Sequence, residues 1–243
     1  SYSNFRSENV IKISNLGDLK VLELFHGPTL AFKDIAMQLI GNFYQYHLEN
    51  EQKKINIIVA TSGDTGAAAI DALKGKSNLN VFVLHPHNRI SPVQRRLMTI
   101  QEESNVFNLA IEGNFDDCQN LVKAMFNDEK FSSDINMSGV NSINWARIIA
   151  QSVYYFFAYF KIGNGQALSF SVPTGNFGDI YAGYLAKKLG LPIDKLIVAT
   201  NKNDILHRAI SGGDYTQKEV KETNTPSMDI QIASNFERLL YDI

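Results

Sequence analysis

The stretch "INIIVATSGDTGAAAIDALKG", Ile55–Gly75, decides the fold. Its first six residues are apolar and β-branched, which predicts a short buried strand. A Gly-rich turn follows, and "AAAIDALKG" (67–75) has the composition of a helix that ends at glycine. A strand that leads through a tight turn into a helix is the repeating unit of a parallel α/β sheet. The stretch therefore predicts an α/β fold.

The same order of elements recurs on both sides of this stretch. Strands are predicted at 79–86, 105–113, 167–173 and 195–200, and helices at 91–103, 115–128, 144–163, 180–190 and 204–213. Ser91 is the expected N-cap of one helix, with Pro92 at its first position. Beyond Gly213 the pattern weakens, and "DYTQKEVKETNTPSMD" (214–229) predicts a loop. This alternation predicts parallel sheets covered by helices on both faces.

Composition narrows the class of protein. The 243 residues are 44% hydrophobic and 20% charged, with a formal net charge of −2. These values are ordinary for a globular protein, and no basic stripe points to nucleic acid. No apolar run approaches the roughly 18 residues of a membrane span. The single cysteine, Cys118, excludes an internal disulfide framework and a multi-cysteine metal site, and the histidines lack metal-ligand spacing. A cytoplasmic protein without a metal is expected.

Two Gly-rich loops stand where a strand ends and a helix begins, the position at which parallel sheets bind ligands. The first contains Ser62, Gly63, Asp64 and Thr65. The second, "TGNFGD" (174–179), lacks both the dinucleotide and the nucleoside-triphosphate spacing, so a small phosphate is the better interpretation. Exposed N–H groups at a helix N-terminus suit an anion. A capped turn without a ligand remains the alternative for both loops.

A third stretch, "NSINWAR" (141–147), leads into a very apolar helix. Arg147 lies in the first turn of that helix, against its dipole, so an anion or a carboxylate should compensate it. Asn141 and Asn144 need hydrogen-bonding partners there. N-capping by an asparagine together with a structural salt bridge is the alternative to a binding role.

Lys33, in "HGPTLAFKDIAM" (26–37), is the candidate nucleophile. A lysine among apolar side chains and helix N-termini loses its proton more easily, and a neutral amine can form a Schiff base. A reactive lysine together with a loop for a lone phosphate describes a site for pyridoxal 5'-phosphate. The alternative is a surface lysine paired with its neighbour Asp34.

Seven stretches together resemble the threonine synthases of many bacteria and of fungi, which are fold-type II pyridoxal phosphate enzymes. The resemblance covers nearly the whole chain and rests on "HGPTLAFKD", "ATSGDTGAAA", "ISPVQ", "FDDCQNLVKAMF", "NSINWARI", "SVPTGNFGDIYAGYLAKKLGLP" and "SMDIQIASNFERLL". It implies two parallel-sheet α/β units like those of the tryptophan synthase β chain. It also implies conversion of O-phospho-L-homoserine and water to L-threonine and phosphate by β,γ-elimination and water addition.

The resemblance also implies roles for individual residues. Lys33 would bind the cofactor as a Schiff base and act in catalysis. The other cofactor ligands would be Gly175, Asn176, Phe177, Gly178, Asp179 and Asn144. The substrate would contact Ser62, Gly63, Asp64, Thr65 and Arg147. Other branches of the fold have Asn at the position of Asp64, which puts a carboxylate-binding role of that residue in doubt.

The organisation expected from the resemblance has a smaller domain at 35–137 and a larger one formed by 1–34 plus 138–243. Family members have further N- and C-terminal segments, so we expect a fragment that is inactive or nearly so. Turnover like that of a full-length relative would refute this expectation. A monomer or weak homo-oligomer with a small-molecule substrate is expected. Two alternatives stay open, a threonine or serine dehydratase-like lyase of the same fold and a non-catalytic synthase-like binding protein.

Overall fold

The computed structural model describes residues 2–51 and 53–243. The chain forms two compact units, Ser1–Asn141 and Ser142–Ile243. The division places residues 1–34 with the first unit. The domain scheme expected from the sequence, 35–137 against 1–34 plus 138–243, stays a prediction.

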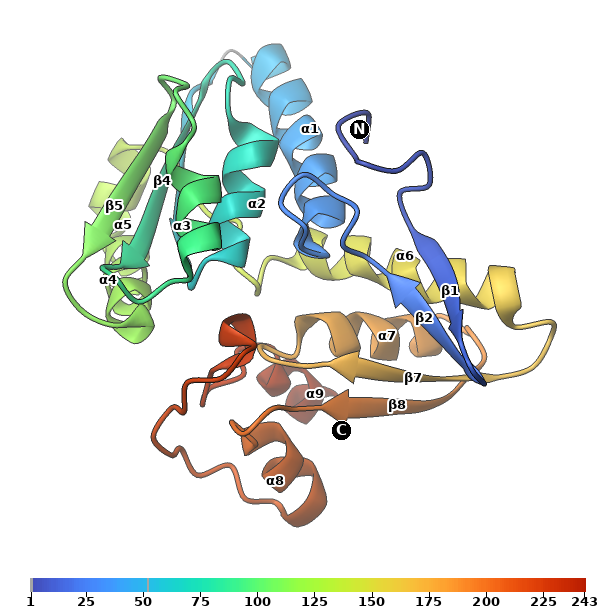
Figure 1. Cartoon of the computed structure of the whole chain (residues 1–243). Helices are drawn as coiled ribbons and strands as arrows, with labels where there is room; N and C mark the ends of the chain where they lie inside the picture. The colour runs from blue at the N-terminus through green and yellow to red at the C-terminus, as the bar shows by residue number, and fades with distance from the viewer. Residues whose placement is uncertain (1, 52) are drawn as a thin grey trace. The chain divides into compact units, whose positions relative to one another are not determined.

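The first unit is a four-stranded parallel sheet with helices on both faces (Figure 1). The strand order is β5-β4-β3-β6, with Ile57 of β3 opposite Val81 of β4. The strands are β3 (Ile55–Ala60), β4 (Leu79–Pro86), β5 (Val106–Ile111) and β6 (Met137–Ser138), and the helices are α1 (Lys33–Glu51), α2 (Asp64–Leu73), α3 (Pro92–Thr99), α4 (Phe115–Asn127) and α5 (Glu129–Asp134). The parallel α/β sheet predicted from the sequence is confirmed.

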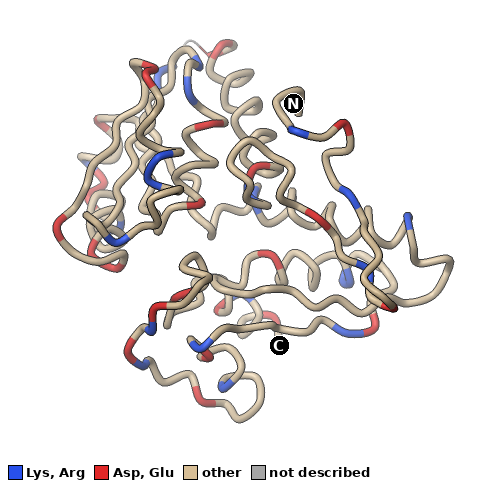
Figure 2. Tube along the Cα trace, viewed as in Figure 1, with Lys and Arg blue, Asp and Glu red and all other residues tan. Residues whose placement is uncertain are grey.

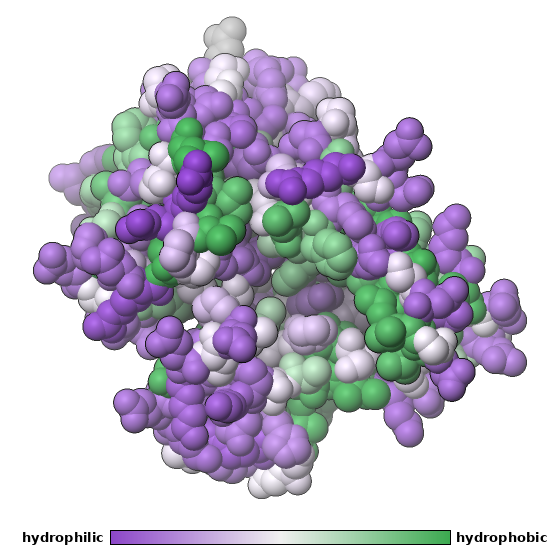
Figure 3. Space-filling model, in the orientation of Figure 1, coloured by the Kyte–Doolittle hydropathy of each residue, from purple (hydrophilic) through white to green (hydrophobic). Residues whose placement is uncertain are grey.

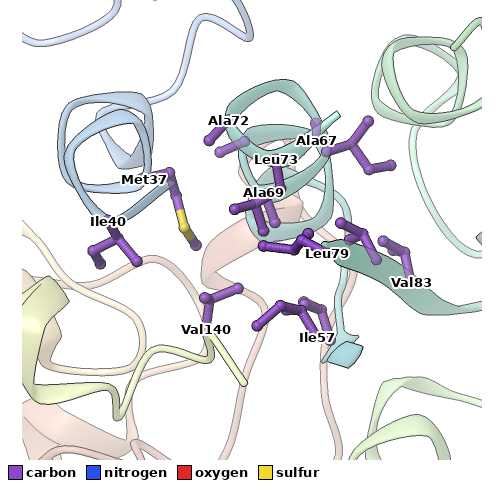
Figure 4. Packing of buried hydrophobic residues seen from close by; sticks show 14 of the residues in the cluster. Met37, Ile40, Ile57, Ala67, Ala69, Ala72, Leu73, Leu79, Val83 and Val140 are labelled. Atoms are coloured by element: carbon purple, nitrogen blue, oxygen red, sulfur yellow. The ribbon is translucent and has the colours of Figure 1, made fainter. Parts of the chain in front are cut away.

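Alternate residues of the central strands face two separate hydrophobic clusters, as the two-residue period of a strand requires. Ile57 and Val59 pack in the cluster beneath α1 and α2, whereas Ile58 packs with Cys118 and Val122 of α4. Figure 4 shows the first cluster, in which α1 and α2 face the sheet through Met37, Ile40, Ala67, Ala69, Ala72 and Leu73. Because both faces are covered, β3 is almost continuously apolar.

An antiparallel hairpin precedes this sheet and was not predicted. It consists of β1 (Lys12–Leu16) and β2 (Leu19–Glu23), and Leu16 pairs with Leu19 across a two-residue turn. Gly17 opens the turn with φ 58°. A glycine at the first of two turn residues is a recognised hairpin signal.

The second unit contains two parallel strands and the helices that follow them in sequence. Its strands are β7 (Leu168–Pro173) and β8 (Ile193–Ala199), and its helices are α6 (Trp145–Ile162), α7 (Gly178–Lys188), α8 (Ile205–Gly212), the 3-10 turn η1 (Pro226–Met228) and α9 (Phe236–Asp242). Tyr155 of α6 packs edge-on against Phe170 of β7, with ring centroids 4.9 Å apart. The helix α9 begins beyond the stretch predicted as loop, 214–229, and was not predicted.

Charges are interspersed along both units. Figure 2 shows acidic and basic residues following one another along the chain, and Figure 3 shows hydrophobic residues scattered among hydrophilic ones on the face drawn. Within residues 2–51 and 53–243, no helix combines the length and the hydropathy that a membrane crossing needs.

His85, at the end of β4, should make stability depend on pH. The side chain is buried, and desolvation lowers its pKa below the ordinary 6.5. The unfolded chain therefore binds more protons below about pH 6.5, so stability is lost as the pH falls from there through the lower folded pKa. We expect His85→Asn to reduce this loss in urea unfolding measured from pH 7.5 to 5. His207→Asn, an exposed control on α8, should keep it. An unchanged pH dependence in His85→Asn would contradict this reading.

Candidate functional site

Lys33 is the first residue of α1, and it bonds to the carboxylate of Asp64 rather than to that of its neighbour Asp34. Its Nζ lies 3.0 Å from Oδ2 of Asp64, and 4.7 Å from the centre of the Phe32 ring. The Lys33 side chain is only 12% exposed. The alternative of a surface pair with Asp34 is therefore wrong, because Lys33 is largely buried and bonds to Asp64.

Asp34 instead fixes the backbone that leads into Lys33. It is fully buried, and its carboxylate accepts hydrogen bonds from the backbone N and the Oγ1 of Thr29, at 2.9 and 2.5 Å. Burial raises the pKa of the Asp34 carboxyl, and the bonds from Thr29 oppose that rise. The turn closed by Asp34 contains Leu30, whose φ is 61°. Asp34 therefore holds the residues before Lys33 in one conformation.

The first Gly-rich loop is organised by a residue that sequence reasoning passed over. Oγ1 of the buried Thr61 accepts hydrogen bonds from the N–H groups of Gly63 and Gly66, at 2.9 and 2.8 Å. Gly63 holds the N-cap position of α2 with φ 135° and has no side chain with which to cap the helix, so Thr61 bonds the first-turn N–H of Gly66 in its place. Thr61 fixes the loop from inside and leaves Asp64 at the first position of the helix.

Gln94 is a second hydrogen-bonding partner of Asp64, besides Lys33. Its Nε2 donates to Oδ1 of Asp64, and its Oε1 accepts from the hydroxyl of Ser91 at 3.0 Å. Ser91 is also the N-cap of α3, as predicted, because it accepts from the backbone N of Gln94. Gln94 was quoted in the resemblance through "ISPVQ" but given no role. The first unit thus brings Lys33, Asp64 and Gln94 into one hydrogen-bonded chain, beside Ser62 and Thr65.

The second Gly-rich loop connects β7 to α7 in the other unit. Phe177, at the N-cap of α7, is left-handed with φ 65° and ψ 3°, and its side chain is buried. A left-handed residue followed by a helical one turns successive N–H groups toward one side, which makes a concave site for an anion. Gly175 lies so close to η1 that an added Cβ would be 2.8 Å from Sδ of Met228. The buried Phe177 side chain and the close approach of Gly175 to η1 therefore fix the backbone conformation of this loop.

Asp179 sits in the first turn of α7 and is bonded to α6. Its Oδ1 accepts from the hydroxyl of Tyr155 at 3.1 Å, and its backbone O accepts from the same hydroxyl at 3.0 Å. Burial and the neighbouring Asp179 raise the pKa of Tyr155 well above its usual range, so the phenol keeps its proton and donates. These bonds hold α7 against α6 and occupy one oxygen of the Asp179 carboxylate.

Asn144 and Arg147 begin α6. Asn144 is the N-cap, and its Oδ1 accepts from the backbone N of Ala146 and of Arg147, at 3.0 and 3.4 Å. The capping alternative for Asn144 is confirmed. Arg147 is 1% exposed, and burial lowers the pKa of its guanidinium to about 10, although Tyr154 opposes that shift. It therefore remains a buried cation at neutral pH, which suits an anionic ligand.

Each unit offers features that fit pyridoxal phosphate. In the first, a largely buried amine stands beside a carboxylate. In the second, the Phe177–Gly178 start of α7 carries no side-chain cap within the described residues, so its N–H groups suit a phosphate. Asn141 adds a buried Oδ1 for which the described part of the chain supplies no hydrogen-bonding partner. Taken by itself, the first unit presents an amine suited to an aldehyde, and the second unit presents a loop suited to a phosphate.

Comparisons with known proteins agree with this chemistry. A family model described as pyridoxal-phosphate dependent enzyme matches residues 10–243. The chain is 52% identical over 257 residues to a threonine synthase of Eremothecium gossypii, covering 99% of this chain and 50% of that protein. It is 54% identical over 245 residues to a threonine synthase of Pseudomonas aeruginosa, covering 100% and 52%.

A solved structure is similar over the same extent. The crystal structure of a PLP-bound threonine synthase from Brucella melitensis matches with a TM-score of 0.91 and 57% identity, covering 99% of this chain and 52% of that one. The chain thus spans about half the length of the curated relatives it matches.

Proposed function

The chain belongs to the pyridoxal-phosphate dependent enzymes, and we propose that it provides the lysine-bearing part of a threonine synthase. The proposed reaction converts O-phospho-L-homoserine and water to L-threonine and phosphate. The observation that carries the proposal is an identity of 52–57% to threonine synthases along 99–100% of this chain. The buried Lys33–Asp64 pair and the phosphate-type loop before α7 support it independently.

Bound pyridoxal phosphate supplies an electron sink that stabilises negative charge next to its imine. The protein has to hold the cofactor and move protons around it. Nζ of Lys33 would bind the cofactor and, once released, take up and return protons. Oδ2 of Asp64 is 3.0 Å from Nζ and orients that amine, and Gln94 orients Asp64 in turn.

The remaining assignments concern the two phosphates of the proposed reaction. The N–H groups of the Gly175–Asp179 loop would hold the cofactor phosphate, with Asn144 as a further cofactor contact. Arg147, a buried cation, would bind the substrate phosphate. Ser62, Gly63, Asp64 and Thr65 would contact the substrate. For Asp64 the hydrogen bonds to Lys33 and Gln94 support a positioning role for the amine beside the proposed substrate contact.

A dehydratase-like lyase of the same fold is the second enzyme to consider. The solved structure of a tomato threonine deaminase is 12% identical to this chain, which is a likeness of fold alone. A dehydratase has no substrate phosphate to bind, so the buried Arg147 favours the synthase. A non-catalytic binding protein would have no need of the buried lysine.

A chimera tests the proposal, because the chain matches about half of each relative. This chain would replace the matching segment of the Pseudomonas aeruginosa threonine synthase. We expect pyridoxal phosphate-dependent phosphate release from O-phospho-L-homoserine, within about a hundredfold of the parent. Conversion of threonine to a 2-oxo acid without phosphate release would favour the dehydratase. A folded, cofactor-loaded chimera with neither activity would overturn both enzyme readings.

The substrate is the only partner that we propose, and a monomer or weak homo-oligomer is the proposed assembly. The single cysteine, Cys118, is buried in α4 and needs no oxidising compartment, which supports a cytoplasmic location. Light scattering of the purified chain at increasing concentration measures the assembly.

A further inference from the structure

Asn235 is a fully buried asparagine immediately before α9, a helix that was not predicted. Its backbone N and its Nδ2 both donate to the carbonyl O of Asn176, each at 3.1 Å. Its Nδ2 also donates to the carbonyl O of Ser142 at 3.0 Å. One side chain therefore joins the loop before α7 to the segment that leads into α6.

The orientation of this amide is fixed by Arg238, one turn further along α9. Nε of Arg238 donates to Oδ1 of Asn235 at 3.1 Å, and its Nη2 donates to the carbonyl O of Ile143 at 2.8 Å. Because Oδ1 receives a charged donor, Nδ2 is the end that faces the two carbonyls. The cost of burying the amide is offset, since both of its ends are bonded.

The bonds to Asn176 control the direction of the next N–H group. A trans peptide unit is planar, and its C=O and N–H point in opposite directions. Two donors from Asn235 hold the Asn176 carbonyl on the side of α9, so the N–H of Phe177 must point to the other side. That N–H begins the concave run of donors at the start of α7.

The same bonds support an unfavourable backbone. Phe177 is left-handed, a conformation that costs a residue with a Cβ about 1–2 kcal/mol. The Phe177 ring packs edge-on against Phe236, the residue after Asn235, with centroids 5.2 Å apart and planes at 77°. The beginning of α9 thus fixes both the backbone before Phe177 and its side chain.

We propose that Asn235 is a positioning residue that sets the phosphate-binding geometry of the Gly175–Asp179 loop. This inference rests on the proposed role of that loop toward the cofactor phosphate. Asn235 does not itself touch the phosphate. It fixes the direction of the donors that do, and through Ser142 it links them to the start of α6, where Asn144 and Arg147 lie.

Two related ligands separate this role from a merely structural one. Pyridoxal phosphate and pyridoxal share the ring and the aldehyde and differ in the phosphate. Dissociation constants of both are measured for the wild-type chain, Asn235→Ala and the milder Asn235→Ser. We expect the constant for pyridoxal phosphate to rise about tenfold or more in the variants, as loss of buried hydrogen bonds predicts. The constant for pyridoxal should change less than about twofold, because pyridoxal does not use the phosphate loop.

Asn105→Ala is the matched control, because the Asn105 amide also donates to backbone carbonyls, those of Leu73, Lys76 and Leu79, but in the first unit. It should leave the ratio of the two constants unchanged. Equal weakening of both ligands in the Asn235 variants, or weakening of neither, would overturn the inference. If Asn235→Ala does not fold, Asn235→Ser decides. A wild-type chain that binds both ligands equally would instead refute the assignment of the loop to the phosphate.

Discussion

Replacing Lys33 with alanine is expected to abolish covalent attachment of pyridoxal phosphate to the chain. The methyl group offers no amine to the cofactor aldehyde. In the chimeric enzyme described above, turnover should fall by at least about 10²–10⁴-fold from the loss of proton transfer alone. The absorbance of the bound cofactor and the rate of phosphate release measure the two effects.

Lys53→Ala is the control for this prediction. Lys53 is also a lysine with a carboxylate partner, Glu51, at 2.6 Å, but its side chain is 67% exposed, against 12% for Lys33. We expect the same absorbance and turnover as in the unmodified protein. A Lys33→Ala variant that kept the cofactor absorbance would mean that another amine holds the cofactor.

Gly63→Ala should destabilise the first unit. Gly63 has φ 135°, and an added Cβ would lie 2.3 Å from the side chain of Gln94. Backbone strain of about 1–3 kcal/mol and the loss of hydrogen bonds as the end of the Gln94 side chain moves aside, about 0.5–1.5 kcal/mol, should together lower the free energy of unfolding by about 2–4 kcal/mol. Displacing Gln94 should also loosen Asp64, to which it donates. Urea unfolding followed by circular dichroism measures the change.

Gly190→Ala separates the two contributions. Gly190 has φ 98°, and nothing lies within 4 Å of an added Cβ, so this substitution introduces strain without displacing a neighbouring side chain. It should cost only about 1–2 kcal/mol. If Gly63→Ala cost no more than Gly190→Ala, the close packing of Gln94 on the loop would be refuted.

The fold of the first unit could be predicted because its signals are local. A strand buried on both faces, such as β3, is a continuous apolar run, and Ser91 with Pro92 marks a helix start by residue type alone. The hairpin β1–β2 was missed because its strands are short and largely exposed, so their hydrophobic pattern is weak. The helix α9 has seven residues and follows a long loop, and contacts rather than propensity support it.

Of the candidate site, the residues with local sequence signals could be predicted, and their partners from distant parts of the chain could not. Lys33 was found from its neighbours, but its carboxylate partner was sought at Asp34. Adjacent residues on a helix do not face each other, so Asp64, 31 residues away, takes that place. Gln94 lies 30 residues from Asp64, and Asn235 lies 59 from Asn176. No periodicity in the sequence reports contacts of this kind, because they depend on how the elements pack.

The central claim is that Lys33 holds pyridoxal phosphate. The chain is mixed with the cofactor, treated with borohydride to make the attachment permanent, and digested for peptide mapping by mass spectrometry. We predict one phosphopyridoxyl group, on the Lys33 peptide, and none there when Lys33→Ala is treated in the same way. Labelling of other lysines with Lys33 unmodified, or no labelling of a folded chain at saturating cofactor, would contradict the account.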